Sequence, residues 1–269
     1  MYGAICGDII GSPYELGNVK STNFPLFGPE STFTDDSVLT AATAETLLDL
    51  PADTKSGRVR AEAYAYHYKQ AFSRHPHAGY GQMFSDWARE PGLSVIHSYG
   101  NGAAMRVTPI GYAYSTLEEV LREARRSCLY THRHPEAIRG AQAVAAAVFL
   151  ARTGASKDTI ARAASRTAGY DLTRPLSAIR PDYQFDSRTG YSVPPAIRAF
   201  LESDDYESAV RLAVSIGGDS DTIACIAGGI AEAFYGGVPK PIADGCWSRL
   251  DSGLKKTVRA FRSNYGLTE

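Results

Sequence analysis

The sequence has no apolar run near the roughly 20 residues that a membrane-spanning helix needs, which excludes a membrane-embedded protein. It also has no excess of one charge, because 28 basic and 29 acidic residues give a formal net charge of -1. A nucleic-acid binder that works through a broad positive field is therefore excluded, although a local basic patch is not. Hydrophobic residues make up 44% of the 269 residues and charged ones 21%, as is typical of a soluble globular protein.

Cysteine is scarce and scattered: Cys6, Cys128, Cys225 and Cys246 form no C-x-x-C pair, which excludes zinc-ribbon and thioredoxin-type sites. The first eleven residues include no lysine or arginine, and an aspartate interrupts their apolar stretch. They are therefore not expected to form a signal peptide. Together these features predict a reduced, cytoplasmic protein without a structural disulfide.

Alternating strand patterns are also scarce, and no glycine-rich phosphate loop follows a predicted strand. Apolar residues instead recur at helical spacing, which predicts an all-α fold: a single compact multi-helix domain over residues 1–269. Residues Ser177–Pro195, rich in Pro, Gly, Asp and Arg, are expected to form a long ordered loop. The strongest helix predictions are Ser37–Leu50, Leu117–Leu129, Pro135–Thr153, Asp204–Ile216 and Thr222–Tyr235.

Two acidic clusters, Thr34–Ser37 and Gly217–Thr222, each precede an apolar helical stretch. For either cluster alone, helix capping is the better interpretation, because Asp, Ser and Thr accept hydrogen bonds from the first N–H groups of a helix. Capping needs one oxygen, however, whereas each cluster offers two carboxylates and two hydroxyls. If the two helix starts meet, the carboxylates need a counter-charge, and a hard divalent cation such as Mg²⁺ or Mn²⁺ supplies it.

Three further segments contain chemically useful residues. Gly7–Glu15 ends on an acid, although for a lone Glu15 a solvated surface position is the better interpretation. Ser98–Arg106 is a small-residue loop whose backbone can approach a phosphate, but its Asn-Gly pair is equally a plain turn. Thr131–Pro135 contains His132, for which a buried or capping role is the simpler interpretation.

Taken in order, these segments resemble the ADP-ribosylglycohydrolase family, which includes dinitrogenase-reductase-activating glycohydrolases and ADP-ribosyl-acceptor hydrolases. One departure is Ser37, where many members have threonine, but a hydroxyl is kept. The resemblance is weakest in Pro51–Pro91 and Ala168–Tyr191. The matching stretches are GAICGDIIGSPYE (3–15), FTDDS (33–37), YGNGAAMR (99–106), THRHPEAIRGA (131–141), SVPPAIRAFL (192–201) and GGDSDTIACIAGGIAEAFYG (217–236).

The resemblance implies an all-α fold with two Mg²⁺ ions, or Mn²⁺, at the bottom of a cleft. It implies catalytic roles for Glu15, Asp35 and Asp36. The implied metal ligands are Thr34, Asp35, Asp36, Asp219, Asp221 and Thr222, and the implied substrate contacts are Gly100, Asn101 and Gly102 at the diphosphate, His132, and Tyr191 and Ser192 at the adenosine side.

The implied activity is hydrolysis of the bond between ADP-ribose and a modified acceptor, an oxocarbenium-like reaction. ADP-ribosyl-arginine on a protein is the expected substrate, serine-linked or other O-linked ADP-ribose is the alternative, and a nucleic-acid target stays open. A non-catalytic ADP-ribose-binding protein, and a helical domain whose acids only cap helices, are the competing interpretations. We expect a monomer that makes no contact with membranes.

Overall fold

The computed structural model describes residues 1–50 and 54–267, and almost all its regular structure is helical. Within the described residues, the extended backbone forms isolated bridges, His97 with His132 and Gly100 with Arg188. None of the described helices is both long and apolar enough to cross a membrane. The elements are α1 (Tyr2–Gly11), η1 (Ser12–Tyr14), α2 (Asp35–Asp49), α3 (Gly57–Arg74), α4 (Gln82–Arg89), α5 (Gly102–Met105), α6 (Thr108–Ala113), α7 (Leu117–Cys128), α8 (Pro135–Arg152), α9 (Lys157–Ala168), α10 (Leu176–Ile179), η2 (Arg180–Asp182), α11 (Thr189–Glu202), α12 (Tyr206–Val214), α13 (Ser220–Tyr235), α14 (Lys240–Arg249) and α15 (Ser252–Asn264).

The all-α prediction is confirmed, and the five predicted helices correspond to α2, α7, α8, α12 and α13. Local signals explain their ends. Thr116 starts α7 with a capping box in which Glu119 takes part, and Gly236 ends α13 in a left-handed conformation. As expected from its apolar circumference, α8 lies within the bundle and packs on α7, α9 and α13.

The expected loop over Ser177–Pro195 is wrong in part, because it contains the end of α10, η2 and the first half of α11. Two prolines, Pro194 and Pro195, lie inside α11. Proline has no N–H, so Pro195 leaves the carbonyl of Tyr191 without its helical donor. The hydroxyl of Tyr183 donates to that carbonyl over 3.3 Å, so the helix is maintained where the prolines predict a loop.

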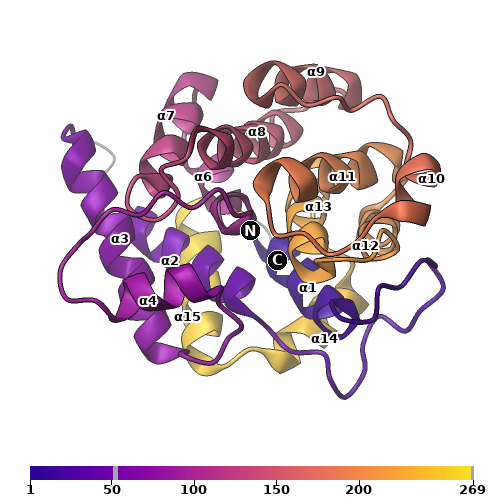
Figure 1. Cartoon of the computed structure of the whole chain (residues 1–269), viewed down its shortest axis with the longest axis horizontal. Helices are drawn as coiled ribbons and strands as arrows, with labels where there is room; N and C mark the ends of the chain where they lie inside the picture. The colour runs from indigo at the N-terminus through magenta and orange to yellow at the C-terminus, as the bar shows by residue number, and fades with distance from the viewer. Residues whose placement is uncertain (51–53, 268–269) are drawn as a thin grey trace.

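The centre of the molecule is the pair α1 and α13, around which α2, α8, α11 and α12 pack (Figure 1). All ten residues of α1 are buried. Gly3, Gly7 and Gly11 recur every fourth residue and face α13: a Cβ on Gly11 would lie 2.6 Å from the carbonyl oxygen of Ser220. The absence of side chains lets the two backbones approach closely, so α1 fixes the position of the start of α13.

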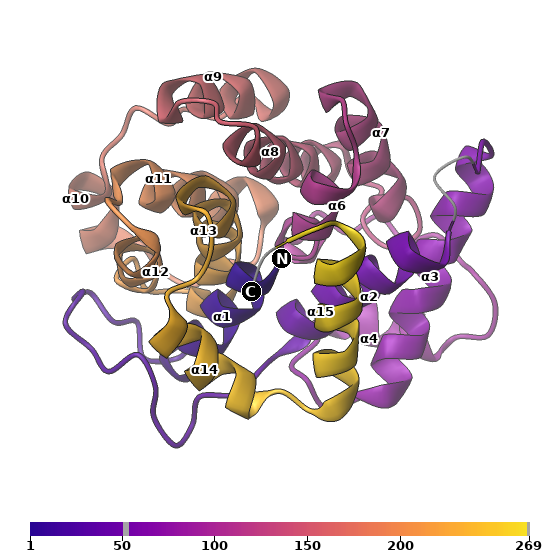
Figure 2. The ribbon, with the colours of Figure 1, turned by 180° about the vertical axis from the view of Figure 1, so that it is seen from behind.

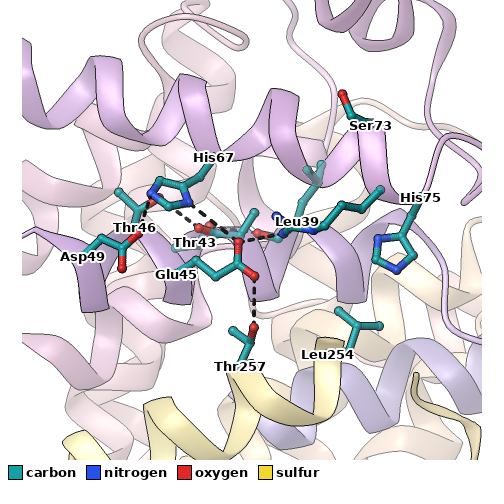
Figure 3. Close-up of polar contacts among 12 residues, drawn as sticks. Leu39, Thr43, Glu45, Thr46, Asp49, His67, Ser73, His75, Leu254 and Thr257 are labelled. Atoms are coloured by element: carbon teal, nitrogen blue, oxygen red, sulfur yellow. Dashed lines mark hydrogen bonds and ion pairs between the residues drawn. The ribbon is translucent and has the colours of Figure 1, made fainter. Parts of the chain in front are cut away.

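A polar network joins α2, α3 and α15 on the side seen in Figure 2 and in close-up in Figure 3. Glu45 of α2 accepts hydrogen bonds from Arg74 of α3 (2.7 Å) and Thr257 of α15 (3.0 Å). His67 of α3 lies between Glu45 and Asp49, at 3.7 and 3.3 Å. These bonds orient α2, whose other end carries one of the two acidic clusters.

Candidate active site

The first acidic cluster lies at the start of α2, where the residue that caps the helix is not one of the two aspartates. Thr34 is the N-cap, and its Oγ1 accepts a hydrogen bond from the N–H of Asp36. The N–H of Asp35 donates to the carbonyl of Ala78 over 2.7 Å. The capping interpretation therefore accounts for Thr34, while the carboxylates of Asp35 and Asp36 are left for another purpose.

The second cluster follows a tight turn at the start of α13. Gly217 and Gly218 have φ of +76° and +67°, a left-handed conformation that glycine adopts readily. Asp219 is the N-cap residue but makes no side-chain capping bond; its Oδ2 accepts from Asn101 instead, at 2.7 Å. Asp219 thus occupies the capping position of α13, but its carboxylate is bonded to Asn101 and does not cap the helix.

The two clusters meet in the fold. The hydroxyl of Thr222 donates to Oδ2 of Asp36 over 3.3 Å, joining residues 186 positions apart. Asp36 and Asp221 are both buried, and carboxylate oxygens of Asp8, Asp36 and Asp221 lie within 4.8 Å of one another. A second group with the same spacing is formed by Glu15, Asp219 and Asp221, so Asp221 belongs to both.

Asp8 is a member that the sequence analysis did not assign. It is fully buried on α1, and its carboxylate accepts hydrogen bonds from the N–H and hydroxyl groups of both Thr34 and Ser37. Burial raises its pKa, while the bonds from Ser37 and Thr34 act in the opposite direction. The available signal was an acid inside an apolar stretch, because such a residue is rarely buried without partners.

The cluster lacks positive charge. Burial, and then the neighbouring carboxylates, raise the pKa values of Asp35, Asp36 and Asp221 well above the ordinary range. Oδ1 of Asp36 is buried and has no hydrogen-bond partner. A set of carboxylate and hydroxyl oxygens with an unpaired, buried member is the donor set that hard divalent cations prefer.

These residues line a cavity of about 500 Å³. Eleven of the predicted site residues face it, whereas Tyr191 and Ser192 are not among the residues that line it. The lining residues from the predicted set are Glu15, Thr34, Asp35, Asp36, Gly100, Asn101, Gly102, His132, Asp219, Asp221 and Thr222.

Tyr191 and Ser192 instead lie behind the cavity wall. The Nδ2 of Asn101 donates to Oγ of Ser192 over 3.0 Å, as well as to Asp219. Tyr191 stacks on Tyr183 with ring centres 4.7 Å apart. Ser192 thus orients Asn101, and Tyr191 packs against Tyr183.

Comparisons with known proteins identify the family and the fold of the chain. The family model described as ADP-ribosylglycohydrolase matches residues 1–265. The chain belongs to the ADP-ribosylglycohydrolase family. The chain is 27% identical to the ADP-ribosylhydrolase ARH3 of Mus musculus, over 95% of this chain and 87% of the relative. It is 30% identical to the ADP-ribosylarginine hydrolase Tri1 of Pseudomonas putida (strain GB-1), over 56% of this chain and 43% of the relative. A solved structure of an "ADP-ribosylglycohydrolase-related protein complex" shares the fold, with a TM-score of 0.66 and 23% identity over 100% of this chain and 97% of that one.

In the loop over Gly100–Gly102, two of the three backbone N–H groups already donate hydrogen bonds within the protein. The N–H of Gly100 donates to Oγ of Ser98 (3.1 Å), and that of Asn101 donates to the carbonyl of Ser187 (2.7 Å). The backbone of Gly102, at the start of α5, is therefore better placed than its two neighbours to meet a ligand.

His132 is buried and lines the cavity beside this loop. Burial, and then the positive charge of Arg106, lower its pKa well below the ordinary value, so the ring is neutral at pH 7. Its Nδ1 lies 2.8 Å from Oγ1 of Thr131, and a Cβ built on Gly102 would lie 3.1 Å from its Nε2. Nε2 is thus the ring nitrogen on the side of the Gly102 loop.

A further part of the cavity lining, beside Asp35, was not predicted. It is formed by Gly79, Gly81 and the first turn of α4, with Met83 and Phe84, and Phe185 also lines the cavity. Met83 and Phe185 are each more than half exposed. Among the described residues, those that line the cavity from these two segments include no acid or histidine, and the family resemblance was weakest there. The sequence therefore offered no signal for this part of the lining.

Proposed function

We propose that this chain is a metal-dependent hydrolase that removes ADP-ribose from a modified acceptor, with two Mg²⁺ or Mn²⁺ ions. The observation that carries the proposal is the pair of carboxylate groups sharing Asp221, one of which includes the unpartnered oxygen of Asp36. The residues that would hold the ions are Thr34, Asp35, Asp36, Asp219, Asp221 and Thr222, the predicted set, with Asp8 and Glu15 beside them.

Divalent ions bound to such a site supply Lewis-acid polarisation of sugar hydroxyls and activation of a water. The chain's own residues then have separate tasks. Asp8 holds Thr34 and Ser37 in place, and Asn101 holds Asp219. The Gly102 backbone is the proposed contact for the diphosphate, next to His132.

Glu15 is the proposed acid or base at the bond to the acceptor. It is half-buried at the edge of the cavity, and burial followed by the charges of Asp219 and Asp8 raises its pKa. A carboxyl group with a raised pKa retains its proton at higher pH and can give it to a leaving group. Glu15→Gln should therefore lower kcat, and an unchanged rate would remove Glu15 from the mechanism.

For the acceptor we propose arginine. Five carboxylates line the cavity, and among the described residues no lysine or arginine does so. Five carboxylates exceed the four positive charges of two divalent ions, so the metal-loaded cavity keeps a negative charge that favours a cationic guanidinium over a neutral hydroxyl at the acceptor position. Arginine is also the acceptor in the name of the Pseudomonas relative, an ADP-ribosylarginine hydrolase.

The decisive experiment measures release of ADP-ribose from peptides modified at arginine or at serine, with Mg²⁺ and with EDTA. We expect turnover of the arginine-linked peptide that EDTA abolishes. Asp36→Asn and Asp221→Asn should each lower kcat by roughly 10- to 100-fold or more. Removing a residue that only supports a metal ligand already costs this much, and these two residues are proposed as ligands themselves. Asp244→Asn, which changes an exposed acid paired with Lys240, is the matched control and should behave as wild type.

Other outcomes have distinct meanings. Full activity in EDTA would contradict the metal scheme, and turnover of the serine-linked peptide alone would replace arginine as the acceptor. Saturable binding of ADP-ribose without release from either peptide would identify a non-catalytic binding protein. If Mg²⁺ produced no saturable rise in Tm, the two acidic clusters would not form a metal site.

A further inference from the structure

The loop that carries Glu15 is fastened to the start of α13 by two side chains, Asn18 and Lys20. Nζ of Lys20 donates to the carbonyl of Ile216 and to that of Tyr183, each over 2.6 Å. Oδ1 of Asn18 accepts a hydrogen bond of 3.1 Å from the N–H of Gly218. The two side chains thus join the Glu15 loop to the turn before Asp219 and to the segment before Phe185.

The turn is shaped to receive these side chains. Ile216 follows the end of α12, where carbonyls lack helical donors and a cation is favoured. Gly217 comes next, and a Cβ there would lie 2.9 Å from Nζ of Lys20. Asn18 itself has φ +44°, the single positive φ among the described non-glycine residues, and asparagine tolerates this conformation better than most residues.

The fastened segments carry three acids of the site. Glu15 lies on the loop, and Asp219 and Asp221 follow the Gly217–Gly218 turn. Carboxylate oxygens of all three lie within 4.8 Å of one another. Like charges at this spacing repel, so the loop needs attachments of its own to keep Glu15 close to the other two.

We propose that Asn18 and Lys20 are positioning residues that hold Glu15 against Asp219 and Asp221. The inference rests on the proposed function for its catalytic consequence, while the attachment itself can be measured without it. Neither side chain lines the cavity, so both act through the acids and not on the substrate.

Lys20→Met tests the attachment by keeping length and removing the donors. We expect kcat to fall about tenfold or more while KM changes little, because a misplaced catalytic group slows the reaction without weakening ground-state binding. The Mg²⁺ concentration that gives half of the metal-induced rise in Tm should also increase. Lys20→Arg, which restores donors, should recover most of kcat.

Lys157→Met is the matched control. Lys157 is also half-buried, and its Nζ donates to two carbonyls at a helix end, those of Leu201 and Ser203 at the end of α11. It does not line the cavity. Its loss should lower Tm and leave kcat and the Mg²⁺ midpoint unchanged.

Asn18→Gly separates the hydrogen bond from the backbone conformation, because glycine accepts the positive φ but has no acceptor oxygen. Hydrogen exchange should show faster exchange of the Gly218 amide in this variant than in wild type, and kcat should fall as in Lys20→Met.

The inference is overturned if Lys20→Met and Asn18→Gly keep the wild-type kcat and Mg²⁺ midpoint, or if Lys157→Met loses kcat as much as Lys20→Met. The proposed function fails differently: the wild-type protein itself would then show neither turnover nor a Mg²⁺-dependent rise in Tm.

Discussion

At the scale of single residues, Asp8 is the side chain on which most polar contacts of the site converge. It is fully buried and accepts hydrogen bonds from Thr34 and Ser37 at the start of α2. Its charge also contributes to the raised pKa values of Asp35 and Asp36. Asp8 therefore both holds the start of α2 and adds to the negative charge that a cation would balance.

Asp8→Asn should accordingly destabilise the protein and weaken its response to metal. The amide replaces an acceptor oxygen with a donor, which leaves at least one buried group unpaired at a cost of about 1–3 kcal/mol. Urea unfolding in EDTA measures this cost, and a Mg²⁺ titration of Tm should show a higher midpoint. Asp205→Asn changes an exposed N-cap to an equally good one and should have little effect. An Asp8→Asn protein with wild-type stability and metal response would contradict the assigned role.

At the scale of elements, the site depends on how closely two helices approach. The glycines of α1 face α13, and Oγ of Ser220 donates to the carbonyl of Gly11 over 3.0 Å. Asp8 lies on α1 and Asp221 on α13, so the distance between these carboxylates is set by the packing of the two backbones. The spacing of the acids is thus a property of the helix pair.

Gly11→Ala should disturb this spacing. The added Cβ would lie 2.6 Å from the Cα of Asp221, so the helices must separate. Overpacking of this kind costs typically about 1–3 kcal/mol, and both Tm and the Mg²⁺ response should fall. Gly28→Ala is the control, because a Cβ at Gly28 meets no atom within 4 Å. Equal Tm values for the two variants would show that the contact between α1 and α13 is more tolerant than the geometry indicates.

At the scale of the whole molecule, the sequence predicts a helix correctly where both the residue pattern and the residues at its ends favour one. Helix α8 has an apolar circumference with Pro135 at its start, whereas the sequence analysis assigned no helix to α1, whose three glycines disfavour one locally. Burial of all ten α1 residues overrides that propensity. Family resemblance and sequence spacing located the carboxylates of α2 and α13. The part of the cavity lining at α4, where Met83 and Phe84 carry no titratable group, becomes visible only in three dimensions.

The charge of the site should also govern the stability of the whole molecule. Because burial and neighbouring carboxylates raise the pKa values of Asp35, Asp36 and Asp221, these three groups bind more protons in the folded protein than in the unfolded chain between an ordinary carboxyl pKa of about 4 and the raised values. The lowered pKa of His132 acts in the opposite direction below about pH 6.5, but it is one group against three. In EDTA, stability should therefore decrease as pH rises through this window. Mg²⁺ replaces the protons as counter-charge, so it should stabilise most at the upper end of the window and flatten the pH dependence.

Tm measured from pH 4.5 to 8 in EDTA and in Mg²⁺ tests this, with the double variant Asp36→Asn/Asp221→Asn expected to reduce both effects. A Tm in EDTA that rises with pH, or a Mg²⁺ effect that is largest at low pH, would show that the acids do not share an unbalanced charge.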